Sequence, residues 1–135
     1  MKNLVLLAPW LFITIFLSAQ TKPAQTVAEK EKLLCRTWKF TLSEEFGLEN
    51  EPAAEQKNDS ILFKSDKKVI MINSGVLTTG FWSLDKGGNF LYVTPDNSAT
   101  KIMFGLKSIT EDKLVLEFQT PDLVRTRYHY EVKRK

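Results

Sequence analysis

The chain has 135 residues, with 19 Lys and Arg against 16 Asp and Glu, a formal net charge of +3. This length suits one domain with a single core. Basic and acidic residues are interspersed except in the tail 132–135, which excludes the basic stripe of a nucleic-acid-binding protein, and one cysteine excludes an internal disulfide framework.

Residues 1–19 have the pattern of a secretory signal peptide. Lys2 precedes an uncharged apolar run, and small residues follow it, with cleavage expected after Ala19. The alternative is a membrane anchor, but a spanning helix needs about 20 apolar residues and this run is shorter. We therefore predict a signal peptide at 1–19 and one exported domain at 20–135, periplasmic or secreted, with no stable membrane anchor after cleavage.

The next segment predicts a short helix. Thr26 and Glu29 have the spacing of a capping box, which favours a helix from about 27 to 35. Cys35 ends it. We interpret this cysteine as a small buried hydrophobe, and the alternative is an intermolecular disulfide in an oxidising compartment.

The rest of the chain predicts strands and turns. Short apolar runs are separated by Gly, Asn, Asp, Ser or Pro, and all but one of the connectors are too short for a crossover helix. Consecutive strands must then pair antiparallel. The eight expected strands are 36–43, 60–65, 68–73, 76–85, 89–95, 100–107, 113–119 and 123–133. Such a set closes most economically into an all-β, eight-stranded antiparallel up-and-down barrel with a short N-terminal helix.

The one long connector, 43–59, is acidic. Its glutamates lack the spacing of a calcium loop, so we expect a solvated loop or lid rather than a metal site.

Alternation along the strands predicts the inward face. In the first strand Trp38, Phe40 and Leu42 share one side, and in the last strand Tyr128 and Tyr130 do. The bulky residues expected to line the barrel are Phe40, Trp82, Phe104, Phe118, Tyr128 and Tyr130. They either surround an apolar cavity or fill the core completely, because an eight-stranded barrel is just wide enough for either.

This arrangement resembles the lipocalins, and more closely the short lipocalin-like proteins exported by bacteria, within the calycin group. The resemblance rests on the short helix, on Trp38 at the start of the first strand and on the meander of strands. The family's first motif is Gly-x-Trp, and here Arg36 stands in place of the glycine. A second Gly-x-Trp, formed by Gly80 and Trp82, lies inside a strand, where a glycine permits close approach of the neighbouring chain.

The resemblance implies that Trp38 closes one end of the barrel and packs against an arginine from the last strand. Arg134 shares the face of Tyr130, so we expect Arg134 to stack on Trp38 in a cation–π contact. A ligand cavity would then open at the opposite end, below the loop 43–59.

Catalytic chemistry is poorly represented. The one histidine, His129, falls on the wet face of its strand, and no second histidine or cysteine nearby supports a zinc site. We therefore expect no enzyme, no cofactor and no metal. Two functions remain open. The first is carrying or sensing a small hydrophobic ligand, and the second is interaction with, or inhibition of, an exported protein through the leader or the loop 43–59, with a filled barrel.

Overall fold

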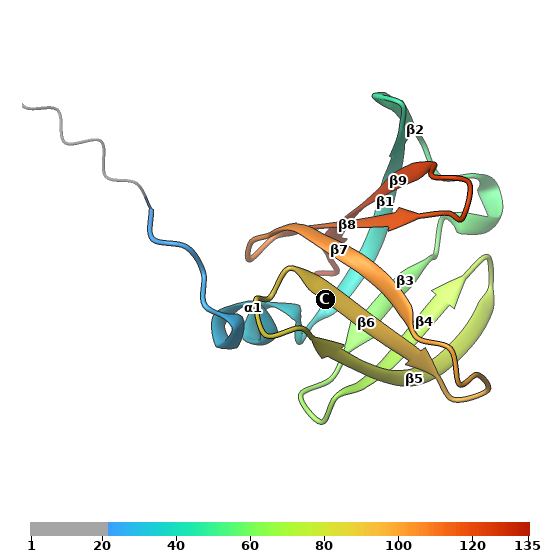
Figure 1. Cartoon of the computed structure of the whole chain (residues 1–135). Helices are drawn as coiled ribbons and strands as arrows, with labels where there is room; N and C mark the ends of the chain where they lie inside the picture. Colours follow the sequence, from blue (N-terminus) through green and yellow to red (C-terminus); the bar gives the residue numbers. More distant parts are fainter. Residues whose placement is uncertain (1–21) are drawn as a thin grey trace, which may run out of the picture.

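The computed structural model describes residues 22–135, so the predicted signal peptide lies outside the described residues. One helix precedes nine strands and a single 3₁₀ turn in this part of the chain (Figure 1). The elements are α1 Val27–Leu34, β1 Thr37–Glu45, β2 Leu48–Asn50, η1 Ala54–Gln56, β3 Ser60–Phe63, β4 Lys68–Asn73, β5 Val76–Leu84, β6 Phe90–Pro95, β7 Ile102–Ile109, β8 Lys113–Gln119 and β9 Arg125–Val132. The described helix is too short to cross a membrane.

Eight of the strands form a closed antiparallel barrel, as predicted. Each strand from β3 to β9 pairs with the next, and β1 pairs with both β3 and β9, which closes the sheet. Closure leaves no unpaired edge along these strands.

The ninth strand corrects the prediction for the long connector. β1 continues to Glu45, and Phe46 and Gly47 make a tight turn into β2, both with positive φ. Two successive positive φ values are what a two-residue hairpin turn requires. The first part of 43–59 is therefore a hairpin that projects beyond the barrel at the top of Figure 1.

A bulge in β1 overturns the predicted inward position of Leu42. Phe40 lies opposite Tyr130, but Leu42 lies opposite His129, so Thr41 is the extra residue. Since an extra residue reverses the alternation beyond it, Leu42 faces outward and Glu45 turns to the interior face. The Thr126 hydroxyl confirms this by donating to Glu45 Oε1 at 2.7 Å.

The helix and the first tryptophan close one end of the barrel. The predicted capping box is present, with Glu29 N donating to Thr26 Oγ1 and Thr26 N to Glu29 Oε2. Trp38 is fully buried, and its Nε1 donates to the Leu34 carbonyl at 3.0 Å. Arg36, in the place of the motif glycine, donates from Nη1 to the Glu111 carbonyl and so joins this end to the β7–β8 turn.

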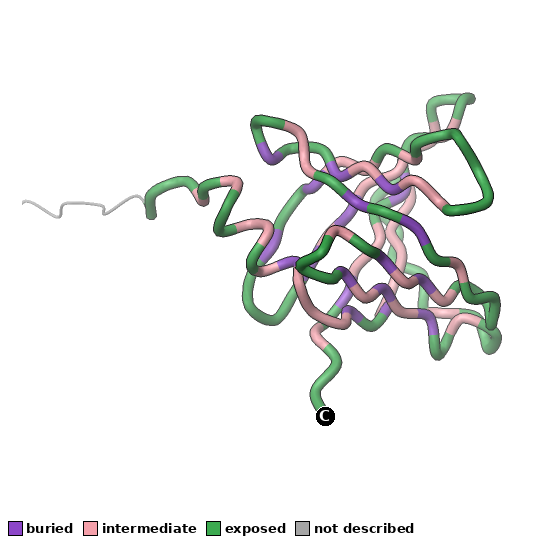
Figure 2. Tube along the Cα trace, turned by 90° about the horizontal axis from the view of Figure 1, so that it is seen from below, coloured by how far each residue is buried: buried purple, intermediate pink, exposed green. Residues whose placement is uncertain are grey.

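Buried side chains form a single core inside the barrel. Figure 2 shows buried and exposed residues alternating along the strands, as a sheet with one wet face requires. The core comprises Leu34, Trp38, Phe40, Ile61, Phe63, Val69, Met71, Trp82, Leu91, Val93, Leu106, Ile109, Leu114, Leu116 and Tyr130.

Gly80 permits the close approach that the sequence predicted. It pairs with Pro95 on β6 and Val69 on β4. A Cβ at Gly80 would overlap the carbonyl oxygen of Thr94 and lie 2.9 Å from the Pro95 Cα, inside any real contact distance. A side chain at this position would therefore separate β5 from β6.

The predicted contact between Arg134 and Trp38 is wrong. The Arg134 side chain is 82% exposed, and its Nη2 lies 3.6 Å from Asp112 Oδ1. The strand pairing ends at Val132, opposite Trp38. Alternation no longer decides the direction of a side chain beyond the end of the ladder, which is why the prediction failed.

Candidate ligand-binding cavity

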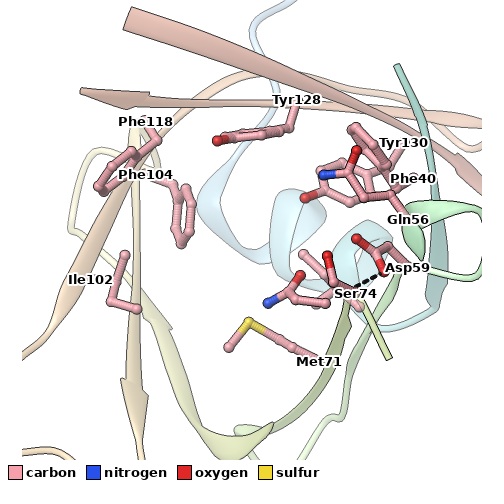
Figure 3. A pocket seen from close by; sticks show the side chains of 12 residues that line it. Phe40, Gln56, Asp59, Met71, Ser74, Ile102, Phe104, Phe118, Tyr128 and Tyr130 are labelled. Carbon is pink, nitrogen blue, oxygen red and sulfur yellow. Dashed lines mark hydrogen bonds between the residues drawn. The ribbon is translucent and has the colours of Figure 1, made fainter. Parts of the chain in front are cut away.

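A cavity of about 320 Å³ lies in the half of the barrel away from Trp38 and is open to solvent on one side (Figure 3). Its lining comes from six strands of the barrel, from the β2–β3 segment and from the β4–β5 turn. The lining residues are Phe40, Gln56, Asp59, Ile61, Met71, Asn73, Ser74, Ile102, Phe104, Phe118, Tyr128 and Tyr130. Gln56 and Asp59 belong to the segment 43–59, so the cavity lies where the sequence placed it.

Aromatic rings form two walls of this cavity. The Phe40 ring lies 6.2 Å from Tyr128 and 5.8 Å from Tyr130, measured between ring centroids. Phe104 and Phe118 form a second pair at 5.9 Å. These five residues are five of the six predicted lining residues, and the tilted ring geometries are those that aromatic pairs favour.

Trp82, the sixth predicted residue, does not line the cavity. Its ring packs edge-on against Phe63 at 5.5 Å, and the Lys67 ammonium lies 4.2 Å from its centroid. The Trp82 Nε1 donates to the Lys64 carbonyl. Alternation correctly predicted the inward face of Trp82, which is 2% exposed, but it carries no information on the height of a residue along the barrel.

Asp59 is the charged residue in the lining. It is 7% exposed, and its Oδ1 accepts a hydrogen bond from Ser74 N at 2.7 Å (Figure 3). Its main chain is also held, because the carbonyl accepts from Phe40 N. Sequence reasoning treated Asp59 as part of an acidic loop, although its place directly before a strand was a signal that the side chain turns inward.

Two tyrosine hydroxyls share the cavity with this carboxylate. Burial, with smaller contributions from Tyr128 and Asp59, raises the pKa of Tyr130 far above its usual value. Burial also raises the pKa of Tyr128, and the nearby Glu45 carboxylate adds to the effect. A tyrosine with its ordinary pKa of about 10 is already protonated in neutral solution, so both hydroxyls are available as hydrogen-bond donors.

The reactive residues considered from the sequence lie away from the cavity. His129 faces outward, where its Nε2 lies 3.4 Å from Glu44 Oε2. Cys35 is partly buried against the core at the closed end, and desolvation raises the pKa of its thiol. Within residues 22–135 no three His, Cys, Asp or Glu side chains are grouped to hold a metal ion.

Comparisons with known proteins support the fold. No family model matches the sequence, and no curated protein matches it. Among solved structures, the chain is similar to a lipocalin-like protein from Bacteroides uniformis, with a TM-score of 0.56 and 15% sequence identity. The match covers 75% of this chain and 99% of that one. The fold is lipocalin-like.

Proposed function

We propose that the protein carries or senses a small, largely apolar molecule held in the barrel cavity. The observation that supports this best is the cavity itself, with paired aromatic walls and a few polar groups at one side. Binding sites for small molecules have this composition. Its volume of about 320 Å³ is near the lower end for such sites and takes on the order of ten water-sized groups.

The placement of the reactive side chains favours binding over catalysis in this proposal. His129 is paired with Glu44 on the outer surface, and the Cys35 thiol lies at the closed end with a raised pKa. Neither reaches the cavity that would hold the ligand. We also propose that the protein works outside the cytoplasm, on the strength of the signal-peptide pattern in residues 1–19.

A fluorescent apolar probe tests the proposal on the purified domain. The native protein should bind the probe, and Phe104→Trp should weaken binding about tenfold because the larger ring occupies cavity space. Phe81→Trp is the matched control, since Phe81 is 53% exposed on the outside of β5. An absence of probe binding, or equal affinity in Phe104→Trp and Phe81→Trp, would contradict the proposal.

A second candidate function is docking to an exported protein through the β1–β2 hairpin. Phe46 and Leu48 at its tip are 83% and 69% exposed, and exposed apolar clusters often mark protein contacts. Purified exported peptidases can be assayed for inhibition by the native protein and by the Phe46→Ser variant. Inhibition that this substitution abolishes, without any change in probe binding, would favour this candidate over the carrier.

A further inference from the structure

Only one of the two carboxylate oxygens of Asp59 accepts a hydrogen bond from the residues that the structure describes. Its Oδ1 accepts from Ser74 N, whereas no hydrogen bond reaches Oδ2 from any residue that the structure describes. Asp59 also takes part in no ion pair within residues 22–135. Both oxygens of a carboxylate can accept hydrogen bonds, so Oδ2 is free to accept one from a ligand.

The free oxygen of Asp59, Oδ2, must face the cavity. The Asp59 residue is 7% exposed, and it lines the cavity. In the described chain no fully enclosed side-chain oxygen or nitrogen lacks a partner. Since Oδ2 has no partner, it is not enclosed by protein, and the free space beside Asp59 is the cavity. The oxygen is therefore open to whatever occupies that space.

The surroundings of this oxygen are negative and electron-rich. The twelve lining residues include neither lysine nor arginine. The Glu45 carboxylate lies on the same interior face, hydrogen-bonded to Thr126 and close enough to act on Tyr128. A buried carboxylate without a cationic partner is costly, so a ligand that brings a positive charge would relieve that cost.

The aromatic wall beside Asp59 suits the same kind of ligand. Tyr130 lies close enough to Asp59 for the two to interact electrostatically, and its ring packs on Phe40. Aromatic faces attract ammonium groups, most strongly where water is excluded. The Phe104–Phe118 pair then offers an apolar surface for the rest of the molecule.

We propose that the cavity selects amphipathic cations, in which an ammonium group binds Asp59 Oδ2 beside the Tyr130 ring and an apolar body packs against Phe104 and Phe118. This inference rests on the proposed function and names the class of its ligand. Neutral and anionic apolar molecules of the same size would bind more weakly, because they leave Asp59 without a positive partner or place a like charge beside it.

Two probes matched in size and shape test the selectivity. 2-Phenylethylammonium and 2-phenylethanol differ in the charged group, and calorimetry or competition with the fluorescent probe gives both affinities. In the native protein the ammonium should bind at least tenfold more tightly than the alcohol, as expected of a hydrogen bond to a charged group in a buried site. 3-Phenylpropionate should bind more weakly than the alcohol.

Asp59→Asn assigns the selectivity to this residue. Asparagine retains an oxygen that can accept from Ser74 N, so the turn is preserved, while the charge is removed. The ammonium and the alcohol should then bind about equally, with the affinity of the alcohol unchanged. Asp122→Asn, at an exposed acid in the β8–β9 loop, is the matched control and should retain the native preference.

The outcomes separate the two proposals. Binding of the apolar probe without any preference for the ammonium overturns this inference and leaves the carrier function in place. Absence of binding by all four compounds overturns the carrier function as well. A preference that persists in Asp59→Asn overturns the assignment to Asp59. If Asp59→Asn fails to fold, the order ammonium, alcohol, carboxylate measured on the native protein still decides whether the cavity selects cations.

Discussion

Replacing Gly80 with alanine tests whether close contact between β5 and β6 is required for stability. The added methyl group would overlap the Thr94 carbonyl oxygen and lie 2.9 Å from the Pro95 Cα. Both atoms belong to the backbone, so no side-chain rotation can relieve the overlap. The two strands would have to separate at a point where they are hydrogen-bonded on both sides.

The expected cost follows from this geometry. Forcing extra volume into a packed site costs about 1–3 kcal/mol and occasionally more, and a contact with backbone alone places Gly80→Ala at about 3 kcal/mol or above. Gly105→Ala is the matched control, because a Cβ there meets its nearest neighbours at 3.5–3.8 Å, which is ordinary contact. Gly105 lies in β7, and alanine there should be neutral or stabilising by about 0.4–1 kcal/mol.

Urea unfolding followed by circular dichroism measures both variants. With an m value of about 1–3 kcal/mol/M, Gly80→Ala should lower the midpoint by at least about 1 M, and Gly105→Ala should leave it nearly unchanged. A Gly80→Ala protein as stable as the Gly105→Ala protein would refute the reasoning, since it would mean that β5 and β6 do not approach as the structure shows.

Three further predictions concern stability. Trp38→Phe should cost about 2–4 kcal/mol in urea unfolding, because it removes buried volume together with the hydrogen bond that Trp38 Nε1 donates to the Leu34 carbonyl. A loss below about 0.5 kcal/mol would contradict this. Burial raises the pKa of the Tyr130 hydroxyl in the folded protein. The contribution of this shift to the free energy of unfolding is therefore complete below about pH 10 and is lost as the pH rises through the folded-state pKa. Tyr130→Phe should therefore lose less stability than the native protein above about pH 10, and identical alkaline unfolding curves would argue against the shift. The backbone amide of Phe90 is the main cause that holds the pKa of Asp85 below its usual value. The Asp85 carboxylate therefore contributes to the free energy of unfolding above about pH 4, and this contribution is lost on further acidification. Asp85→Asn should make stability less dependent on pH in acid, and an unchanged dependence would count against this role.

The architecture was predictable from local patterns. Turn residues at short intervals forced consecutive strands to pair as hairpins, and the capping box at Thr26 located the helix. Alternation correctly turned Phe104, Phe118 and Tyr128 toward the interior. These patterns succeed because they depend on interactions between residues close in sequence, or on which side of a strand a residue faces.

The failures came from features that local patterns do not record. The extra residue at Thr41 reversed the faces of the rest of β1 and brought Glu45 inside. Arg134 lies beyond the end of the strand pairing, where alternation no longer determines which way a side chain points. The hairpin turn at Phe46 and Gly47 was hidden within a segment interpreted as a loop.

The sequence by itself determined that the chain forms an antiparallel barrel with an aromatic interior. It did not determine whether that interior is filled or hollow, because cavity volume depends on how side chains from distant strands meet. Only the tertiary structure separated Trp82, packed at the closed end, from Phe104 at the cavity. It alone also brought Asp59 from the acidic connector to the cavity wall. The height of a residue along the barrel arises from closure of the whole sheet, and no short stretch of the chain encodes it.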